Sequence, residues 1–406
     1  MKSKQLEVDV LIAGGGLVGG TLAVGLVEGG LSVAVVDTLD PAEGIDAGFD
    51  GRAAAIALSS KKVMEGLGLW ETMQLETCPI KEIRVSDADS LFFLHYDRKD
   101  VGTEAFGYMV ENRSIRKSLR ARFKMLKDFT LLAPNSIINV DRNPGEVLAT
   151  LADGRVVKAR LIVGAEGRRS PTRDEAGIKL TSWSYKQSGI VCTVAHELSH
   201  DNVAHEHFLP AGPFAILPLP NNHSSIVWTE RAELVDEIMA MDDVGFLSEL
   251  KYRFGDFLGE LNVVGPRWSY PLSLQYAERA VDHRLVLAGD ASHGMHPIAG
   301  QGLNMGLRDV AVLAEVLTDA RRMGLDPGDG TVLNSYERGR RFDNTLMLAM
   351  TDMLNRLFSN DIEPVRFARD LGLAAVNKLP PLKRLFMMHA MGLVGDLPRL
   401  MRGKTL

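Results

Sequence analysis

Apolar residues in several parts of the chain form short, nearly continuous runs that alternate with helical stripes. Residues 8–13 and 33–36 are two such runs, and Leu22 and Leu26 recur at helical spacing between them. Residues 161–164 and 285–288 are further runs of the same kind. Runs of this length and apolarity are typical of buried strands, and strands that alternate with helices indicate an α/β fold.

Two other segments, residues 78–98 and 186–270, show little helical periodicity. The second contains four short runs rich in β-branched or aromatic residues, at 190–196, 203–208, 214–219 and 225–230. Such runs favour strands, and we predict a separate antiparallel sheet inserted into the α/β part. Residues 130–160 are also strand-like, and Asp153-Gly154 predicts a hairpin turn. After Tyr336 the pattern is helical and rich in methionine.

These patterns divide the chain into three predicted parts. Residues 1–77, 99–185 and 268–345 form a discontinuous α/β domain, residues 78–98 and 186–267 form the sheet domain, and residues 346–406 form a helical C-terminal region.

Composition narrows the classes of partner. The net charge of -6 and pI near 6.0 argue against nucleic acid. No apolar stretch approaches the roughly 18 residues of a membrane span, and residues 1–10 lead directly into a strand without a secretory pattern. The two cysteines form no CxxC motif and suggest a reducing compartment. We therefore expect a cytoplasmic protein, with any contact to the inner membrane being peripheral.

The first glycine motif follows the first predicted strand. Gly14, Gly16 and Gly19 form a GxGxxG pattern between a strand and a helix, which is the context of a dinucleotide-binding turn. Asp37 ends the next strand about 20 residues later. An acid at this position accepts hydrogen bonds from ribose hydroxyls and repels a 2′-phosphate. The pair of features favours the adenosine half of FAD, or NAD, over NADP.

A second glycine-rich turn lies near residue 300. Asp290 follows the strand at 285–288, and Gly300 and Gly302 precede a long helical stripe. A helix start of this kind leaves backbone N–H groups unpaired at the positive end of the helix dipole, which suits phosphate or an electron-rich carbonyl. His293 and His296 could be loop histidines or a metal pair. We predict no metal, because no third and fourth ligands cluster nearby.

The residues of this turn carry a family resemblance. The sequences GDASH (289–293), HP (296–297) and AGQGLN (299–304) resemble the FAD-binding signature of single-component aromatic hydroxylases, above all the ubiquinone-biosynthesis branch. The resemblance covers most of the chain, because the motifs occur in family order. It implies a Rossmann-like, three-layer ββα FAD-binding domain interleaved with an antiparallel substrate-binding sheet domain, plus a helical tail.

The resemblance also implies the residues that contact FAD. They combine both glycine-rich turns with two arginines and are Gly14, Gly16, Gly19, Asp37, Arg52, Arg113, Asp290, Pro297, Gly300, Gly302, Leu303 and Asn304. From the residues alone, Arg52 could equally be a solvated charge and Arg113 a salt-bridge partner at a helix start. Where the family usually has Asp-Gly, this chain has Glu166-Gly167, so a carboxylate remains but is one methylene longer.

The activity that the resemblance implies is FAD-dependent hydroxylation of a polyprenylated phenol in ubiquinone biosynthesis, with NAD(P)H and O₂, through a flavin C4a-hydroperoxide. No acid or base can be nominated from the sequence. Another flavin enzyme, such as an epoxidase or prenyl reductase, remains an alternative, as does a non-catalytic FAD-bound subunit of a biosynthetic assembly. The Trp-x-Trp element of halogenases is absent.

Basic residues dominate the end of the chain. Past Asp370 they face only Asp396 and are Lys378, Lys383, Arg384, Arg399, Arg402 and Lys404. The predicted apolar face of the adjoining helix comprises Leu382, Leu385, Phe386, Met388 and Met391. This combination predicts contact with an anionic membrane surface or a partner protein. A helix that covers the core of the cofactor domain explains the methionines equally well.

Overall fold

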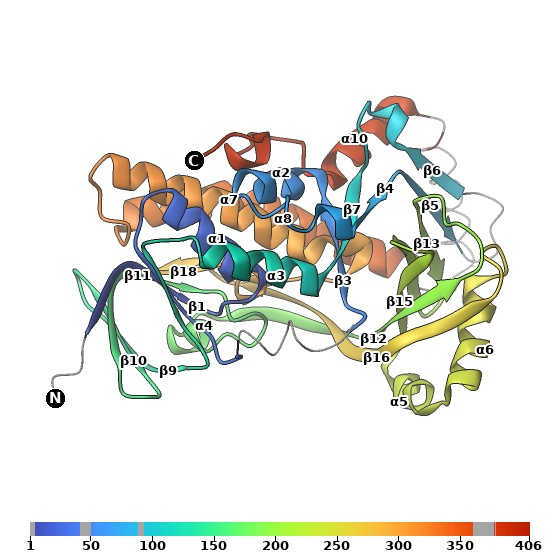
Figure 1. Cartoon of the computed structure of the whole chain (residues 1–406), viewed down its shortest axis with the longest axis horizontal. Coiled ribbons are helices and arrows are strands. Elements are labelled where there is room, and N and C mark those ends of the chain that lie inside the picture. The colour runs from blue at the N-terminus through green and yellow to red at the C-terminus, as the bar shows by residue number, and fades with distance from the viewer. Residues whose placement is uncertain (1–4, 41–49, 88–92, 360–376, 378) are drawn as a thin grey trace.

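The structure is a computed structural model that describes residues 5–40, 50–87, 93–359, 377 and 379–406. Its first sheet has the strand order β17-β18-β11-β1-β2-β8 (Figure 1). The strands are β1 (Leu6–Ala13), β2 (Val33–Val36), β8 (Phe129–Leu132), β11 (Val156–Gly164), β17 (Val281–Asp282) and β18 (Leu285–Leu287). All pairs from β18 to β8 are parallel. The apolar runs recognised in the sequence therefore form a parallel sheet.

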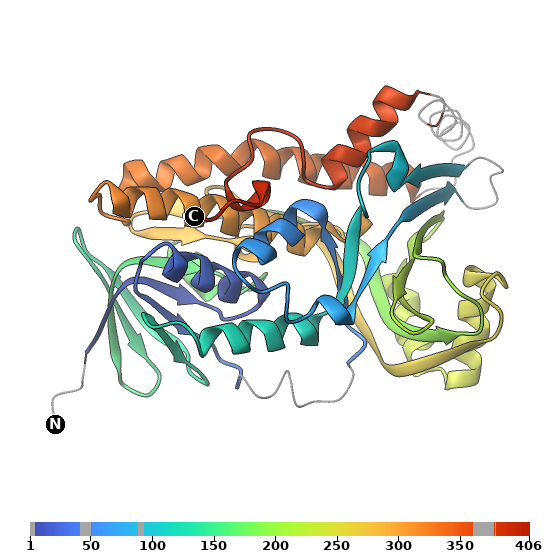
Figure 2. The same cartoon turned by 45° about the horizontal axis from the view of Figure 1, so that its top comes forward.

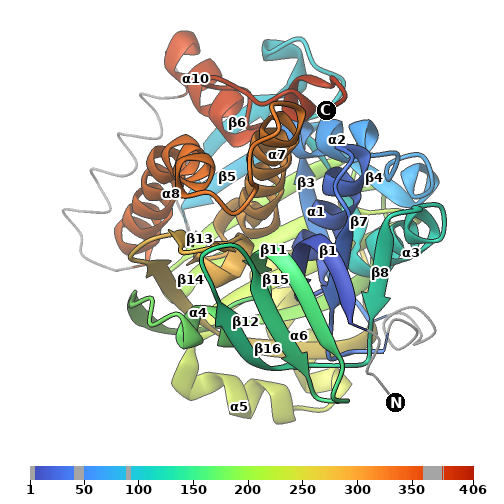
Figure 3. The same cartoon turned by 90° about the vertical axis from the view of Figure 1, so that its left-hand side faces the viewer.

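Helices cover one face of this sheet. They are α1 (Leu17–Glu28), α2 (Leu58–Gly66), α3 (Asn112–Phe123), α7 (Gln301–Arg322) and α8 (Gly330–Phe358). Alternation within β1 decides which layer each residue supports, since Val10 and Ile12 pack with the helices while Leu11 packs on the opposite face. Figure 3 shows α1 and α7 side by side over β1 and β11.

An antiparallel meander covers the opposite face. It consists of β9 (Ile137–Arg142), β10 (Val147–Leu151) and the first part of β11. The predicted turn at Asp153-Gly154 joins β10 to β11, and Gly154 has a φ of 83°. Val147 and Ala149 pack against Leu11 beneath the parallel sheet. The three-layer ββα arrangement is confirmed.

The second sheet has the order β19-β16-β12-β15-β14-β13-β5-β6. Its strands are β5 (Glu82–Asp87), β6 (Phe93–Asp97), β12 (Leu180–His196), β13 (Val203–Leu209), β14 (Gly212–Leu219), β15 (His223–Arg231), β16 (Leu261–Ala277) and β19 (His293–Gly294). The predicted antiparallel sheet is present, and one of its strand pairs departs from the prediction, because β5 runs parallel to β13. The short β-branched and aromatic runs predicted where each strand lies, but they gave no information on the direction in which it runs.

Two helices lie where helical periodicity was judged poor. They are α5 (Ala232–Ala240) and α6 (Asp243–Phe254). Val235 and Ile238, three residues apart, and Phe246 and Leu250, four apart, pack beneath the sheet against Trp228. A helical stripe was therefore present in the sequence, but it was too short to stand out between strands.

A small third sheet connects these parts and consists of β3 (Ala53–Ala57), β7 (Gly107–Glu111) and β4 (Thr77–Ile80). The remaining described elements are α4 (Pro171–Glu175), α10 (Pro380–Ala390), η1 (Gln74–Glu76), η2 (Arg98–Asp100), η3 (Gly289–Ala291), η4 (Ile298–Gly300) and η5 (Leu400–Arg402). The division into three domains stays a prediction. Residue 78 lies in β4, which pairs with β7, and α8 continues unbroken across the proposed boundary at residue 345.

Candidate active site

The glycines of the first turn have three different surroundings. Gly14 has a φ of 97°, and a Cβ there would lie 2.5 Å from the carbonyl oxygen of Ala165. A Cβ at Gly19 would lie 2.0 Å from the carbonyl oxygen of Gly14, whereas a Cβ at Gly16 would meet nothing within 4 Å. The outer glycines therefore let the turn close and the helix pack, while the middle one leaves room for a ligand.

Asp37 lies beside this turn at the end of β2. Its carboxylate accepts hydrogen bonds from the N–H of Gly15 at 2.5 Å and of Leu39 at 2.8 Å. The acid is half-buried and borders the space left open at Gly16. This is the position that the sequence predicted for an acid facing a ribose.

Asp290 lies in the tight turn after β18. Its backbone carbonyl accepts a hydrogen bond from Gln275 Nε2 at 2.8 Å, while its carboxylate has no hydrogen-bond partner among the described residues. Burial raises the pKa of this carboxyl, and the positive charge of Arg168 opposes the rise. A carboxylate that no donor meets among the described residues is suited to accepting hydrogen bonds from a ligand's hydroxyls.

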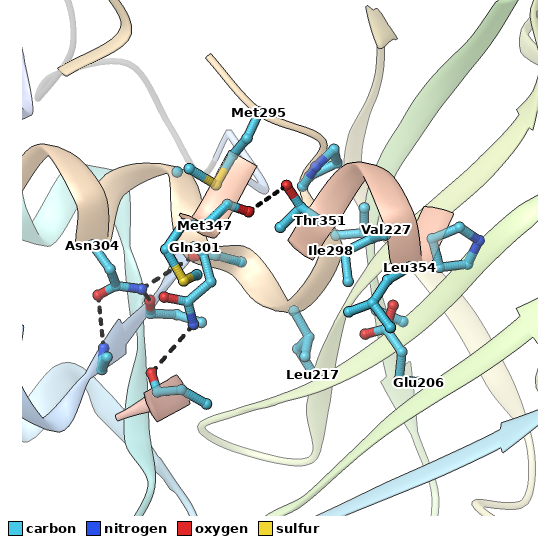
Figure 4. Close-up of a pocket in the computed structure, with 18 of the residues that line it drawn as sticks. Glu206, Leu217, Val227, Met295, Ile298, Gln301, Asn304, Met347, Thr351 and Leu354 are labelled. Atoms are coloured by element: carbon cyan, nitrogen blue, oxygen red, sulfur yellow. Dashed lines mark hydrogen bonds between the residues drawn. The ribbon is translucent and has the colours of Figure 1, made fainter. Parts of the chain in front are cut away.

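The start of α7 is shaped by Gly300, which has a φ of 61°. A Cβ at Gly302 would meet nothing within 4 Å. Asn304 is buried, and its amide bonds Ala57 N and Ala55 O at 2.8 Å each (Figure 4). Asn304 thus ties the start of α7 to β3, while the open side of Gly302 remains free to approach a ligand.

The two turns contact one another through α1. A Cβ at Gly289 would lie 3.2 Å from the side chain of Val18, in the first turn of α1. The helix that begins at the first glycine motif therefore packs on the turn that carries Asp290.

Asp309 on α7 was missed by the sequence reasoning. It is fully buried and accepts hydrogen bonds from Gly289 N at 2.8 Å, His293 Nε2 at 2.6 Å and Arg340 Nε at 2.6 Å. Burial alone would raise the pKa of Asp309, but His293 and Arg340 outweigh it and lower the pKa to about 2. Asp309 therefore fixes the turn before Asp290. In the sequence Asp309 stands beside Arg308, and two adjacent charges are typical of a solvated helix surface.

The predicted arginines have different surroundings. Arg52 pairs with Asp50 at 2.7 Å, lies 5.2 Å from the ring centre of Trp268 and is about half exposed. Arg113 begins α3, and its buried Nε has no partner among the described residues. Glu166 is occupied within its own loop, where Ser170 Oγ donates to it at 2.7 Å and Thr172 N at 3.2 Å.

A cavity of about 1400 Å³ opens beside the second turn. Six of the predicted cofactor residues line it, namely Asp290, Pro297, Gly300, Gly302, Leu303 and Asn304. The other six predicted residues are not part of its lining; they are Gly14, Gly16, Gly19, Asp37, Arg52 and Arg113. Beyond η4 the cavity becomes apolar between the second sheet, α8 and α10 (Figure 4).

These features fit FAD. Gly16 and Gly302 leave the backbone approachable. Among the described residues, the buried Nε–H of Arg113 and the carboxylate of Asp290 have no hydrogen-bond partner. A phosphorylated, polyhydroxylated cofactor offers partners for each of them. Within the described ranges, no group of three or more His, Cys, Asp or Glu residues is placed to hold a metal ion.

Comparison with known proteins agrees with this geometry. The family model described as FAD binding domain matches residues 7–348. The fold also matches p-nitrophenol 4-monooxygenase PnpA from Pseudomonas putida, with a TM-score of 0.80 and 17% identity over 97% of this chain and all of that one. The chain therefore belongs to the FAD binding domain family of flavoproteins.

Sequence relatives define the branch. Ubiquinone hydroxylase UbiL of Rhodospirillum rubrum is 56% identical over all of this chain and 95% of its own length. The 3-demethoxyubiquinol 3-hydroxylase of Escherichia coli is 34% identical over 95% of this chain and 98% of its own. Human COQ6, a ubiquinone biosynthesis monooxygenase, is 31% identical over 96% and 93%. The chain belongs to the ubiquinone-hydroxylase family of FAD-dependent monooxygenases.

Proposed function

We propose that this enzyme hydroxylates the aromatic ring of a polyprenylated phenol, with NAD(P)H and O₂ as co-substrates. The observation that carries the proposal is the cavity of about 1400 Å³, which is polar at Asp290 and the start of α7 and apolar beyond. The part of the cavity at the start of α7 is assigned to the cofactor. The apolar part beyond η4, between the second sheet and α8, suits an aromatic ring that carries an isoprenoid chain.

One set of residues is assigned to the cofactor and another to the substrate. The two glycine turns, Asp37 and Asp290 hold FAD, which when bound supplies the redox chemistry that delivers oxygen to the ring. The N–H groups at the start of α7 lie at the positive end of the helix dipole and stabilise negative charge on the cofactor. The apolar lining formed by Leu217, Val227 and Leu354 orients the substrate and excludes water.

Purified protein containing FAD should oxidise NADH or NADPH several-fold faster when a short-chain prenylated phenol is added, and should consume oxygen in step. The reason is that each hydroxylation of the phenol consumes one NAD(P)H and one O₂ and releases one water, so both rates rise together when substrate is present. The measurement combines an oxygen electrode with nicotinamide absorbance and product detection, and phenol-free enzyme gives the background rate. Absence of substrate-dependent oxygen uptake with several phenols and both nicotinamides would favour the non-catalytic alternative.

We further propose that α10 brings the enzyme to the lipid that holds its substrate. Leu379 and Leu385 are 51% and 52% exposed there, and Phe386 is 36% exposed. The exposed face is smaller than the predicted one, because Met391 is buried and lines the cavity, as do Met387 and the partly exposed Phe386. The helix α10 thus has an outer apolar face and an inner face that lines the cavity. It lies beside strands β5 and β6 (Figure 2).

The basic border of this surface is smaller than the sequence suggested. Lys383 pairs with Asp100 at 2.9 Å, and Arg399 pairs with Asp319 at 2.6 Å on α7. Arg384 is exposed, whereas Lys378 lies outside the described residues. Within the part of the chain that is described, no helix is long and apolar enough to cross a bilayer. The proposed contact is therefore with the bilayer surface.

Leu385→Glu should reduce sedimentation with anionic vesicles about tenfold while FAD content stays unchanged. The substitution removes an exposed apolar anchor and adds a negative charge. Each of these two changes weakens the free energy of vesicle binding by about 1 kcal/mol or more. Leu75→Glu is the matched control, because Leu75 is 97% exposed in η1. Equal sedimentation of Leu385→Glu and the wild type, or an equal loss in both variants, would contradict the proposal.

A further inference from the structure

The apolar part of the cavity contains an acid that the cofactor does not explain. Among the described residues that line the cavity, only Asp290 and Glu206 carry carboxylates. Asp290 belongs to the cofactor turn. Glu206 lies on β13, in the second sheet, and Figure 4 shows it apart from Gln301 and Asn304 at the start of α7.

Sheet register places Glu206 on the cavity face. Its neighbours across the sheet are Val85 on β5 and Ala215 on β14, and both of them line the cavity. In Figure 4 its side chain lies beside Leu354 of α8 and shares the cavity with Val227. The surroundings of this carboxyl group are thus aliphatic on the sheet and on the facing helix.

Glu206 has no hydrogen bond and no ion pair with any other described residue. Burial raises its pKa to about 7. A carboxyl group in an apolar cavity costs stability unless a polar partner meets it, and an aliphatic residue would pack better at this place. Its neighbours Ala204 and Phe208 on the same strand face are apolar. Glu206 is therefore available to a ligand group that can donate a hydrogen bond.

We propose that Glu206 binds the ring hydroxyl of the substrate and thereby orients the ring in the cavity. This inference rests on the proposed function, since a prenylated phenol offers a single strong donor on an otherwise apolar molecule. The ionised carboxylate, which predominates above about pH 7, accepts that hydrogen bond and provides more strength than a neutral acceptor, so binding is measured at about pH 8. It also repels a ring that presents a carboxylate of its own at the same place. Glu206 thus selects uncharged phenols.

The test measures binding to the oxidised holoenzyme, without turnover. A phenol with one prenyl group, and its methyl ether, are titrated while the flavin absorption spectrum is followed. The wild type should bind the phenol at least tenfold more tightly than the ether, because the ether cannot donate. Glu206→Leu should bind the two within threefold of each other, and Glu206→Gln, which keeps a neutral acceptor, should fall between.

Glu82→Gln is the matched control. Glu82 lies on the adjacent strand β5, outside the cavity lining, and pairs with Arg84 and His95. This variant should keep the full preference for the phenol. Flavin content and melting temperature establish that each variant is folded, and Glu206→Gln retains the test if Glu206→Leu loses flavin.

The outcomes separate this inference from the proposed function. A wild type that binds both ligands equally, or a Glu206→Leu variant that keeps the wild-type preference, overturns the role of Glu206 and leaves the hydroxylase intact. A wild type that binds neither ligand at any prenyl length overturns both, because the substrate class itself is then wrong.

Discussion

Asp290→Ala should purify nearly free of flavin while remaining folded. The carboxylate of Asp290 has no hydrogen-bond partner among the described residues and lies at the second glycine turn. Each hydrogen bond that it makes to FAD contributes about 1.5–3 kcal/mol, as is usual for a charged acceptor. Loss of one or two such bonds raises the dissociation constant for FAD about 10- to 1,000-fold or more. The ratio of flavin to protein absorbance after purification measures the effect.

Asp290→Asn is the matched control for this variant. The amide keeps the shape and one acceptor oxygen, so flavin content should lie between the wild type and alanine. Because burial raises the pKa of Asp290, removal of its charge should not destabilise the flavin-free protein. Full flavin occupancy in Asp290→Ala would remove Asp290 from the cofactor site.

The sequence predicted the cofactor half of the enzyme well, because its signals are local. The strands that became β1, β2 and β18 are buried on both faces and therefore nearly continuous in apolar residues. The glycines of the turns stand in the sequence where the chain must bend or approach a ligand. Gly14 and Gly300 both have positive φ, which few other residues tolerate.

The substrate half was less predictable, because its features depend on pairing between distant segments. Whether β5 runs parallel to β13 depends on the path of the chain, to which the residues of the strands themselves give no clue. Glu206 lies on the same strand face as Ala204 and Phe208. In the sequence it looks like an ordinary polar residue of a strand, and only the cavity shows that it has a special place. The face of α10 was misjudged because methionine suits both an exposed face and a cavity wall.

Asp309 shows a third limit, which is that a buried charge cannot be recognised without its partners. In the sequence it stands beside Arg308, an adjacent charge that suggests a solvated helix surface. In the structure Asp309 pairs with His293 and Arg340, while Arg308 pairs with Asp343. Asp309 and Arg308 lie on α7, and their partners Arg340 and Asp343 lie on α8. These ion pairs therefore connect the two helices next to the turn at Gly289.

Asp309→Asn should lower the melting temperature by about 5 °C or more and weaken flavin binding. The amide fills the same space, but it leaves Arg340 without its buried counter-charge and weakens the support of the turn at Gly289. Loss of one partner from a buried ion pair typically costs about 3–5 kcal/mol. Asp319→Asn, on the same helix α7, is the control, because its side chain is 46% exposed and its partner Arg399 keeps Glu315. That variant should lose clearly less stability.

The effect of Asp309 should also depend on pH in one direction. Its pKa in the folded protein, about 2, is below the value near 3.9 of an unfolded aspartate. A lowered pKa means that the unfolded chain binds the proton first, so this stabilisation is complete above about pH 4 and is lost as the pH falls toward 2. Thermal melts of the wild type and Asp309→Asn across this range measure the difference. An advantage of the wild type that stays constant down to pH 2.5, or one that is absent at pH 7, would show that the carboxylate of Asp309 does not hold the two helices together.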